Sequence, residues 1–311
     1  MNASANGSDR VKRVAPGTPA TVGDCSKFAN DSLGHSPTNS SRRNVTSADV
    51  NALARLLNAR QRACLADVAR LGIATARHLE RLHYASTEAG RRLARLELSS
   101  LCDWRVLQRL SRRVGGVRGG SRGYIYALGV AGQRLAFPGR RRYRAPWTPQ
   151  PSYLRHALDV AETYVGLREA ENAGTIHLAV YDAEPACWRS FTGPGGTRVT
   201  LKPDAYVVTQ HETFEDRWFI EVDRGTEDGP RVQRKLKTYL AYWRCGREQE
   251  HEGVFPLTCW IAPTDKRARF LLEVVRRLSD ADQRLFVVTT KDDAISLITG
   301  NEPTTRKEVN P

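Results

Sequence analysis

Apolar side chains recur every three to four residues through the first ordered part of the chain, which is the spacing of helices that bury one face. Small hydroxyl-bearing residues precede each apolar series, as is typical of helix N-termini. The first series ends at Gly72, and the third covers 88–98, where arginines surround an apolar face. The pattern therefore predicts three helices, with N-caps at Ser47, at Thr75 and at Ser86 or Thr87.

The pattern then changes to that of a hairpin. Segment 104–114 is predicted to be a strand, 115–123 a loop rich in glycine and arginine, and 124–128 a short aromatic strand. Three helices followed by a hairpin with a basic tip are typical of a winged helix-turn-helix domain, in which the third helix enters the major groove of DNA and the wing contacts phosphate. We expect such a domain over 46–139; an ordinary solvated helix and an idle loop would give the same pattern. The arginines expected to contact DNA are Arg91, Arg92, Arg95, Arg112, Arg113, Arg118 and Arg122.

A different alternation begins after 140–151, a basic and proline-rich segment that we interpret as a linker. The elements predicted beyond it are, in order, a helix at 153–172, strands at 176–181, 199–209 and 217–223, a helix at 230–245, a strand at 257–261, a helix at 265–278 and a strand at 284–289. This order predicts an α/β domain with a mixed sheet over 152–298, in a chain of two domains. Segments 1–45 and 299–311 lack such patterns, and we interpret them as a disordered leader and a flexible tail.

Charge is distributed unevenly along the 311 residues. The formal net charge is +14, but residues 1–150 contain 26 lysines and arginines against 9 acidic residues, whereas 151–311 contain 22 against 25. Between Trp104 and Leu158 there are twelve arginines and no acidic residue. A solvated surface normally mixes both signs, so this stretch predicts a phosphate-binding surface and double-stranded DNA as the partner. A GC-rich genome would explain the excess of arginine over lysine, but not the missing carboxylates.

Several classes of protein are excluded or disfavoured. The sequence has no run of eighteen apolar residues and no apolar leader, so we expect no membrane-spanning helix, no membrane partner and a cytoplasmic location. The six cysteines form no C-x-x-C pair, which argues against a zinc ribbon or a disulfide framework. The phosphate-binding loop of an ATPase is absent, and no His-x-His triplet supports relaxase chemistry with a nucleophilic tyrosine.

The chemistry of the second domain is expected at three acidic residues. Glu221 and Asp223 alternate along one strand and therefore share a face. If the preceding hairpin is centred with Thr209 opposite Asp216, then Asp204 lies opposite Glu221, with the two Cβ atoms roughly 4.5–5.5 Å apart. Carboxylates gathered in this way are the hard ligands that Mg²⁺ or Mn²⁺ requires. The alternatives are an exposed acidic sheet end, or ion pairs with Arg224 and Lys235.

A Pro-Asp pair followed by an acid-x-acid string on the next strand, within an αβββαβ order, resembles the PD-(D/E)xK nuclease fold. Asp204 and Glu221 stand at its two acidic positions. The resemblance implies a metal ion that activates water for phosphodiester hydrolysis, and a lysine that orients the water or neutralises charge. Asp223 stands at the usual lysine position, so the resemblance implies Lys235 on the following helix as the substitute. It also implies Glu162 on the leading helix as a further acid. A solvated lysine and a surface glutamate would fit the same pattern.

The longest resemblance, over about 46–290, is to the replication-relaxation family of bacterial mobile elements. Its most specific part is the string Glu-x-Asp-Arg-Gly-Thr-Glu at 221–227, followed by Lys235-Leu236 and Tyr239. The resemblance implies a DNA-binding protein of plasmid replication or DNA relaxation. The implied partners are plasmid DNA such as an origin, a second copy of the chain and proteins of a replication complex. Two functions stay open: a metal-dependent nicking endonuclease, and a non-catalytic replication initiator or transcriptional regulator with a degenerate nuclease-like domain.

Overall fold

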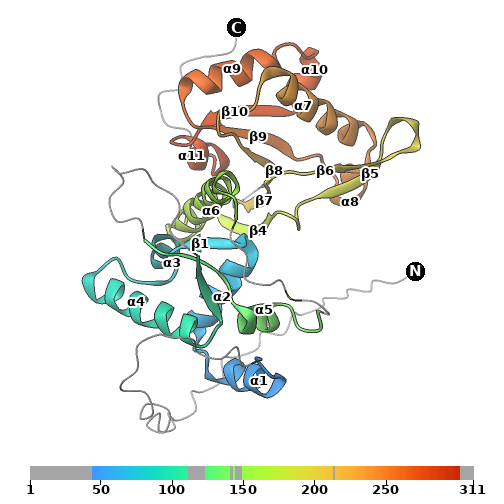
Figure 1. The fold of residues 1–311 in the computed structure, drawn as a ribbon. Coiled ribbons are helices and arrows are strands. Elements are labelled where there is room, and N and C mark those ends of the chain that lie inside the picture. Colours follow the sequence, from blue (N-terminus) through green and yellow to red (C-terminus); the bar gives the residue numbers. More distant parts are fainter. Residues whose placement is uncertain (1–43, 111–122, 141–142, 144–148, 213, 302–311) are drawn as a thin grey trace, which may run out of the picture. The chain divides into compact units, whose positions relative to one another are not determined.

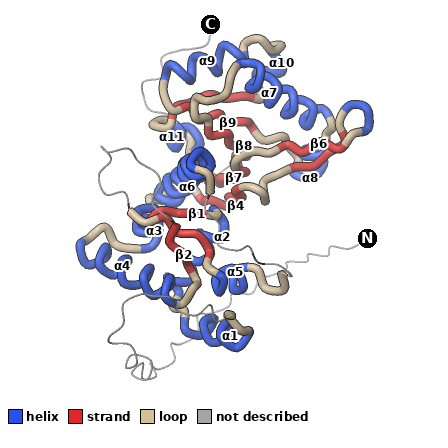
Figure 2. The backbone as a smooth tube through the Cα atoms, viewed as in Figure 1, coloured by secondary structure: helices blue, strands red, loops and turns tan. Residues whose placement is uncertain are grey.

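Two groups of helices and strands make up the part of the chain that the computed structural model describes, residues 44–110, 123–140, 143, 149–212 and 214–301 (Figures 1 and 2). The described residues from Val45 onward belong to one compact unit with an α+β fold. Nearly all of the predicted leader, and most of the predicted linker and tail, lie outside the described residues. Within those ranges, no helix is long and apolar enough to span a bilayer.

The first helices begin where side chains cap them. Thr46, not Ser47, is the N-cap of α1 (Ser47–Leu56), and Asn58 starts α2 (Ala59–Leu71) through a capping box. The prediction of one helix up to Gly72 is therefore wrong, because the Asn58 amide oxygen accepts from a new helix N-terminus and interrupts the apolar series. Gly72 ends α2 with a φ of 75°, as expected for a glycine stop.

The next two helices and a small antiparallel sheet complete the first group. α3 (Ala76–His83) and α4 (Glu88–Asp103) begin at the predicted caps Thr75 and Thr87. The sheet has the order β1-β3-β2, and a short helix follows it. The bounds of these elements are β1 (Ile73–Thr75), β2 (Leu107–Leu110), β3 (Ile125–Leu128) and α5 (Val130–Ala136). The predicted hairpin is thus present, while its tip lies outside the described residues.

The second group is built on a mixed five-stranded sheet in the order β10-β9-β8-β7-β4. The pairs β4–β7 and β7–β8 are antiparallel, and the pairs β8–β9 and β9–β10 are parallel. The strands are β4 (His177–Ala183), β7 (Ala205–Gln210), β8 (Glu215–Val222), β9 (Leu257–Ala262) and β10 (Phe286–Thr290). The predicted mixed sheet is therefore confirmed.

The strand predicted at 199–209 is in fact two strands in different sheets. β6 (Arg198–Leu201) pairs with β5 (Arg189–Thr192) in a separate two-stranded sheet, and a one-turn 3₁₀ helix joins them. β6 ends at Leu201 and β7 starts at Ala205, so residues 202–204 cross between the two sheets. Proline has no N–H for a strand ladder, so Pro203 marks the break.

Helices cover both faces of the five-stranded sheet (Figure 1). Residues of α7 and α9 pack on one face with Phe219, whereas residues of α6 and α11 pack on the other with Trp218 and Ile220. Because side chains alternate along β8, Glu221 points to the same face as Phe219, toward α7. The helix bounds are α6 (Pro151–Asn172), α7 (Gly229–Arg244), α8 (Arg247–Glu252), α9 (Asp265–Val275), α10 (Asp280–Gln283) and α11 (Ala294–Ile298).

Candidate functional site

Asp204 and Glu221 lie at the open end of the β7–β8 hairpin. The structure confirms the register assumed from the sequence as far as the pair of Ala205 with Ile220, since Thr209 pairs with Asp216. Asp204 comes just before β7, and its N–H donates to the carbonyl of Ile220 at 2.9 Å, one residue out of that register. Asp204 is 7% exposed and Glu221 is 1% exposed. The hairpin therefore brings two buried carboxylates to one place.

Asp204 is held by the leading helix and by the neighbouring strand. Its Oδ1 lies 2.9 Å from Nε2 of His156, in the second turn of α6, and its Oδ2 accepts a hydrogen bond from the N–H of Val222 at 2.7 Å. The hydrogen bond to Asp204 raises the pKa of His156, although partial burial opposes this effect. Both oxygens of Asp204 thus have partners, and one partner is a cation when His156 is protonated.

Glu221 is bound by two side chains of α7. Its Oε2 accepts a hydrogen bond from Nζ of Lys235 at 2.6 Å, and its Oε1 accepts one from the hydroxyl of Tyr239 at 2.6 Å. Lys235 and Tyr239 are four residues apart, so they lie on one face of the helix. Burial raises the pKa of Glu221 to about 7, an effect that Lys235 only partly offsets. Burial lowers the pKa of Lys235, but the charges of Glu221 and Asp204 and the hydrogen bond to Glu221 together raise it.

Asp223 has a different environment, in the loop directly after β8. Its two carboxylate oxygens accept hydrogen bonds from Nε and Nη2 of Arg267 on α9, each at 2.8 Å, and Oδ2 also accepts from the N–H of Gly225 at 2.7 Å. Gly225 has a φ of 73°, which favours glycine. Arg267 also donates to the carbonyl of Glu227, so one guanidinium fixes the whole loop. A role of Asp223 as a metal ligand stays a prediction.

The ion pairs considered as an alternative are present in part. Lys235 forms an ion pair with Glu221, as that alternative predicted. Arg224 instead contacts Asp159 on α6, and Lys291 contacts the other oxygen of Asp159 at 2.7 Å. The acidic end of the sheet is therefore neither exposed nor uncompensated, because each of these carboxylates has a cationic partner.

A cavity of about 400 Å³ connects these groups. Asp204, Glu221, Asp223, Lys235 and His156 all line it. Across the residues that the structure describes, no group of three or more acidic, histidine or cysteine side chains is arranged to hold a metal ion. Two carboxylates beside open space still fit Mg²⁺, since this ion is commonly bound through one or two carboxylates, with waters and substrate phosphates as its other ligands.

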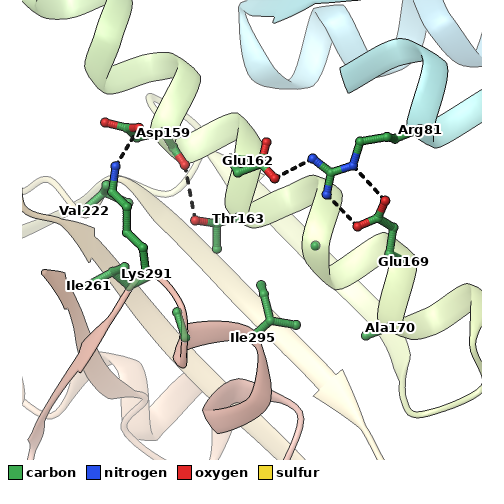
Figure 3. Close-up of a pocket in the computed structure, with 12 residues that line it drawn as sticks. Arg81, Asp159, Glu162, Thr163, Glu169, Ala170, Val222, Ile261, Lys291 and Ile295 are labelled. Atoms are coloured by element: carbon green, nitrogen blue, oxygen red, sulfur yellow. Dashed lines mark hydrogen bonds and ion pairs between the residues drawn. The ribbon is translucent and has the colours of Figure 1, made fainter. Parts of the chain in front are cut away.

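Glu162, predicted on the leading helix as a further acid, lines a neighbouring cavity of about 430 Å³ (Figure 3). Its carboxylate lies 3.1 Å from Nε2 of His78 and contacts Arg81, and both of these residues are on α3. His78 and Arg81 lower the pKa of Glu162 to about 2. Arg81 also donates to both oxygens of Glu169. The structure thus places Glu162 in the contact between α3 and α6, and not beside Asp204.

The arginines predicted to contact DNA divide into two sets. Arg91 and Arg95 pair with Glu88 on the exposed face of α4, whereas Arg92 is exposed and has no acidic partner among the described residues. The other set, predicted around the hairpin, lies outside the described residues: Arg112, Arg113, Arg118 and Arg122.

Sequence reasoning assigned no role at this site to three of its residues. The sequence did not indicate that His156 contacts Asp204 from another element, and Arg267 is 44 residues beyond Asp223. Tyr239 gave a usable signal, because it follows Lys235 by one helical turn and therefore faces the same acid.

Comparison with known proteins gives one match. The model of a family described as replication-relaxation matches residues 65–258, which include α3, α4, the β7–β8 hairpin and α7. No curated protein and no solved structure matches the chain.

Proposed function

Since this chain belongs to the replication-relaxation family, we propose that it binds DNA through its first group of helices and acts on a DNA strand at the cavity beside Asp204. The observation that carries the proposal is the meeting of two buried carboxylates, a lysine and a histidine in one cavity. Charged groups are costly to bury, and clusters of them in a cavity with perturbed pKa values are typical of functional sites.

The proposed DNA-binding domain is a winged helix formed by α2, α3, α4 and the β1-β3-β2 sheet. In this proposal α4 is the helix that enters the major groove, and Arg92 and Arg95 on its exposed face contact the DNA. The pairs of Glu88 with its neighbouring arginines are exposed, so phosphate can replace Glu88 at little cost. Arg109 on β2 stacks over Tyr124 at 4.7 Å and extends the basic surface toward the hairpin.

The proposed catalytic domain follows the αβββαβ order of PD-(D/E)xK nucleases, through α6, β4, β7, β8, α7 and β9. Asp204 and Glu221 would hold Mg²⁺ or Mn²⁺, and Lys235 would take the place of the motif lysine. When bound, such an ion polarises a phosphoryl oxygen and offsets the charge that develops on it during hydrolysis. The reaction class is hydrolysis of a phosphodiester bond in DNA.

The protein side chains prepare the cavity for this chemistry. The hydroxyl of Tyr239 and Nζ of Lys235 fix both oxygens of Glu221, while His156 and the N–H of Val222 fix those of Asp204. Groups held in this way need little reorganisation when a phosphate arrives. Nε2 of His156 lies 2.9 Å from Oδ1 of Asp204, and this contact raises the pKa of His156.

A second function is supported by the loop after β8. Asp223 stands where PD-(D/E)xK nucleases usually have lysine, and Arg267 binds both of its oxygens. A carboxylate locked in a buried ion pair is typical of a structural element. The competing proposal is therefore a non-catalytic replication initiator or regulator, whose second domain serves assembly.

Nicking of supercoiled plasmid distinguishes these two functions. The purified protein is incubated with plasmid and Mg²⁺ or Mn²⁺, beside Asp204→Asn, Glu221→Gln and Lys235→Met. Glu215→Gln is the matched control, because Glu215 is an exposed carboxylate on the same strand as Glu221. Metal-dependent nicking that is lost in the three site variants and kept in the control supports the enzyme. DNA binding without nicking under any metal supports the initiator.

DNA binding itself is tested on α4. Arg92→Ala with Arg95→Ala removes two exposed cations from the proposed recognition helix. The slope of the logarithm of affinity against the logarithm of salt concentration should fall by about 2 for duplex DNA. The control is Arg276→Ala with Arg277→Ala, which removes the same charge at the far end of α9. Equal slopes for both double variants would remove α4 from the proposed interface.

A further inference from the structure

Each acid that lines the cavity has a basic partner within the protein. Three of these pairs are Asp204 with His156, Glu221 with Lys235, and Asp223 with Arg267. The fourth pair joins Glu227 to Arg231 on α7, at 3.1 Å. Arg224 also lines the cavity, whereas its partner Asp159 does not. An additional cation with no acidic partner therefore makes the local field more favourable to phosphate.

Arg155 is that additional cation. It lies on α6 next to His156, it lines the cavity, and it is exposed. Among the described residues, it has no acidic partner and no hydrogen-bond partner. A guanidinium that is always charged and offers a planar set of donors matches the geometry of a phosphate.

Arg231 borders the cavity through its partner Glu227 and does not itself line it. It lies one turn before Lys235 on α7, and its side chain is 67% exposed. Its partner Glu227 lines the cavity. An exposed ion pair of this kind contributes little to stability, so Arg231 is able to exchange Glu227 for a phosphate.

We propose that Arg155 and Arg231 bind phosphates of one DNA strand at the cavity and so position a phosphodiester beside Asp204 and Glu221. A cavity of about 400 Å³ is at the small end of ligand cavities, so it accommodates a nucleotide unit and not a duplex. The inference deepens the proposed function and rests on it: the two arginines give the second domain its own contact with DNA, in addition to α4.

The test is binding of a fluorescent single-stranded oligonucleotide in EDTA, measured by anisotropy over a range of KCl concentrations. In Arg155→Ala with Arg231→Ala, the salt slope should fall by about 1.4, since each phosphate contact on a single strand accounts for about 0.7. Arg155→Lys with Arg231→Lys should keep the slope of the native protein. Arg276→Ala with Arg277→Ala is the control for charge alone. Both arginines are exposed, so the midpoint temperature of thermal unfolding should match that of the native protein.

The outcomes separate this inference from the proposed function. If the native protein binds DNA and the slope of the Arg155 and Arg231 alanine variant equals that of the control, the inference is overturned while the proposed function stands. If the native protein binds no DNA at any salt concentration, both are overturned. The titration is repeated in a protein that already carries Arg92→Ala and Arg95→Ala. Adding the Arg155 and Arg231 substitutions to it should lower the salt slope by the same amount as in the native protein, because distant contacts are additive.

Discussion

The stability of a Glu221→Gln variant, measured relative to the native protein, should increase as the pH rises. Glu221 is 1% exposed, and its pKa is about 7 in the folded chain against an ordinary value of 4.5. Between these two values the unfolded chain loses the proton while the folded chain keeps it, so the native protein loses stability as the pH rises through this window. The Glu221→Gln variant has no such proton to lose.

The magnitude follows from the size of the shift. A change in pKa from 4.5 to about 7, at about 1.4 kcal/mol for each unit, corresponds to about 3 kcal/mol. The stability of the variant relative to the native protein should therefore rise by about 3 kcal/mol between pH 4.5 and pH 8. Glutamine still accepts from Lys235 but removes the charge that partners it, which adds a destabilising offset at every pH in this range.

The assay is urea unfolding in EDTA at several pH values between 4.5 and 8. His156 and Glu184 also have raised pKa values, but both are present in the two proteins, so they cancel in the difference. Glu215→Gln is the control for losing one acidic charge from β8. If the difference in unfolding free energy between the variant and the native protein stays constant across this pH range, the reasoning is refuted. Ionisation of Glu221 would then not be what makes the stability depend on pH.

Three further predictions concern residues outside the proposed chemistry. Arg267→Ala leaves Asp223 buried without its cation and should cost about 3–5 kcal/mol, measured by urea unfolding at pH 7. Gly166→Ala places a Cβ 2.7 and 2.8 Å from side-chain carbons of Ile295 and should cost about 1–3 kcal/mol, which Ile295→Ala should partly restore. The pKa of Glu162 is lowered from 4.5 to about 2, so its contribution to the stability of the fold is present above pH 4.5 and is lost as the pH falls toward 2. Glu162→Gln should therefore cost about 1 kcal/mol of stability at pH 7 and less at pH 3, where the value at pH 7 allows for a half-exposed side chain.

Each of these predictions has a result that would contradict it. An Arg267→Ala variant as stable as the native protein would show that water reaches Asp223. A Gly166→Ala variant of unchanged stability would show that Ile295 has free space to move into. A Glu162→Gln effect of equal size at pH 7 and pH 3 would mean that the contact with α3 depends on shape and not on charge.

The hairpin that carries the site was predictable from the sequence for a simple reason. A strand pair has one register once its loop is centred, so the pairing of Thr209 with Asp216 places Asp204 and Glu221 at the same end of the hairpin. Lys235 was suggested by the resemblance to PD-(D/E)xK nucleases and not by helix periodicity, which fitted a solvated face of the helix equally well. Local periodicity was sufficient for the hairpin alone.

The remaining parts depend on packing between distant segments. Glu162 and His156 are six residues apart on α6, which is about 1.7 turns, so they project to different sides of the helix. The sequence did not reveal which side meets Asp204, because both sides of α6 carry polar residues among the apolar ones. The break at Asn58 was missed because its capping box competes with an apolar series that continues on both sides.

The ion pair between Asp223 and Arg267 also has a consequence for the order of events during protein synthesis. The two residues are 44 positions apart, and Arg267 belongs to a helix that follows the whole β7–β8 hairpin. At about 5–20 residues per second, a ribosome adds Arg267 roughly 2–9 s after Asp223. During this interval the residues of the hairpin have all been synthesised, but the loop after it still lacks Arg267, the cation that fixes its shape. The nascent chain therefore carries Asp204 and Glu221 before it can close the loop beside them.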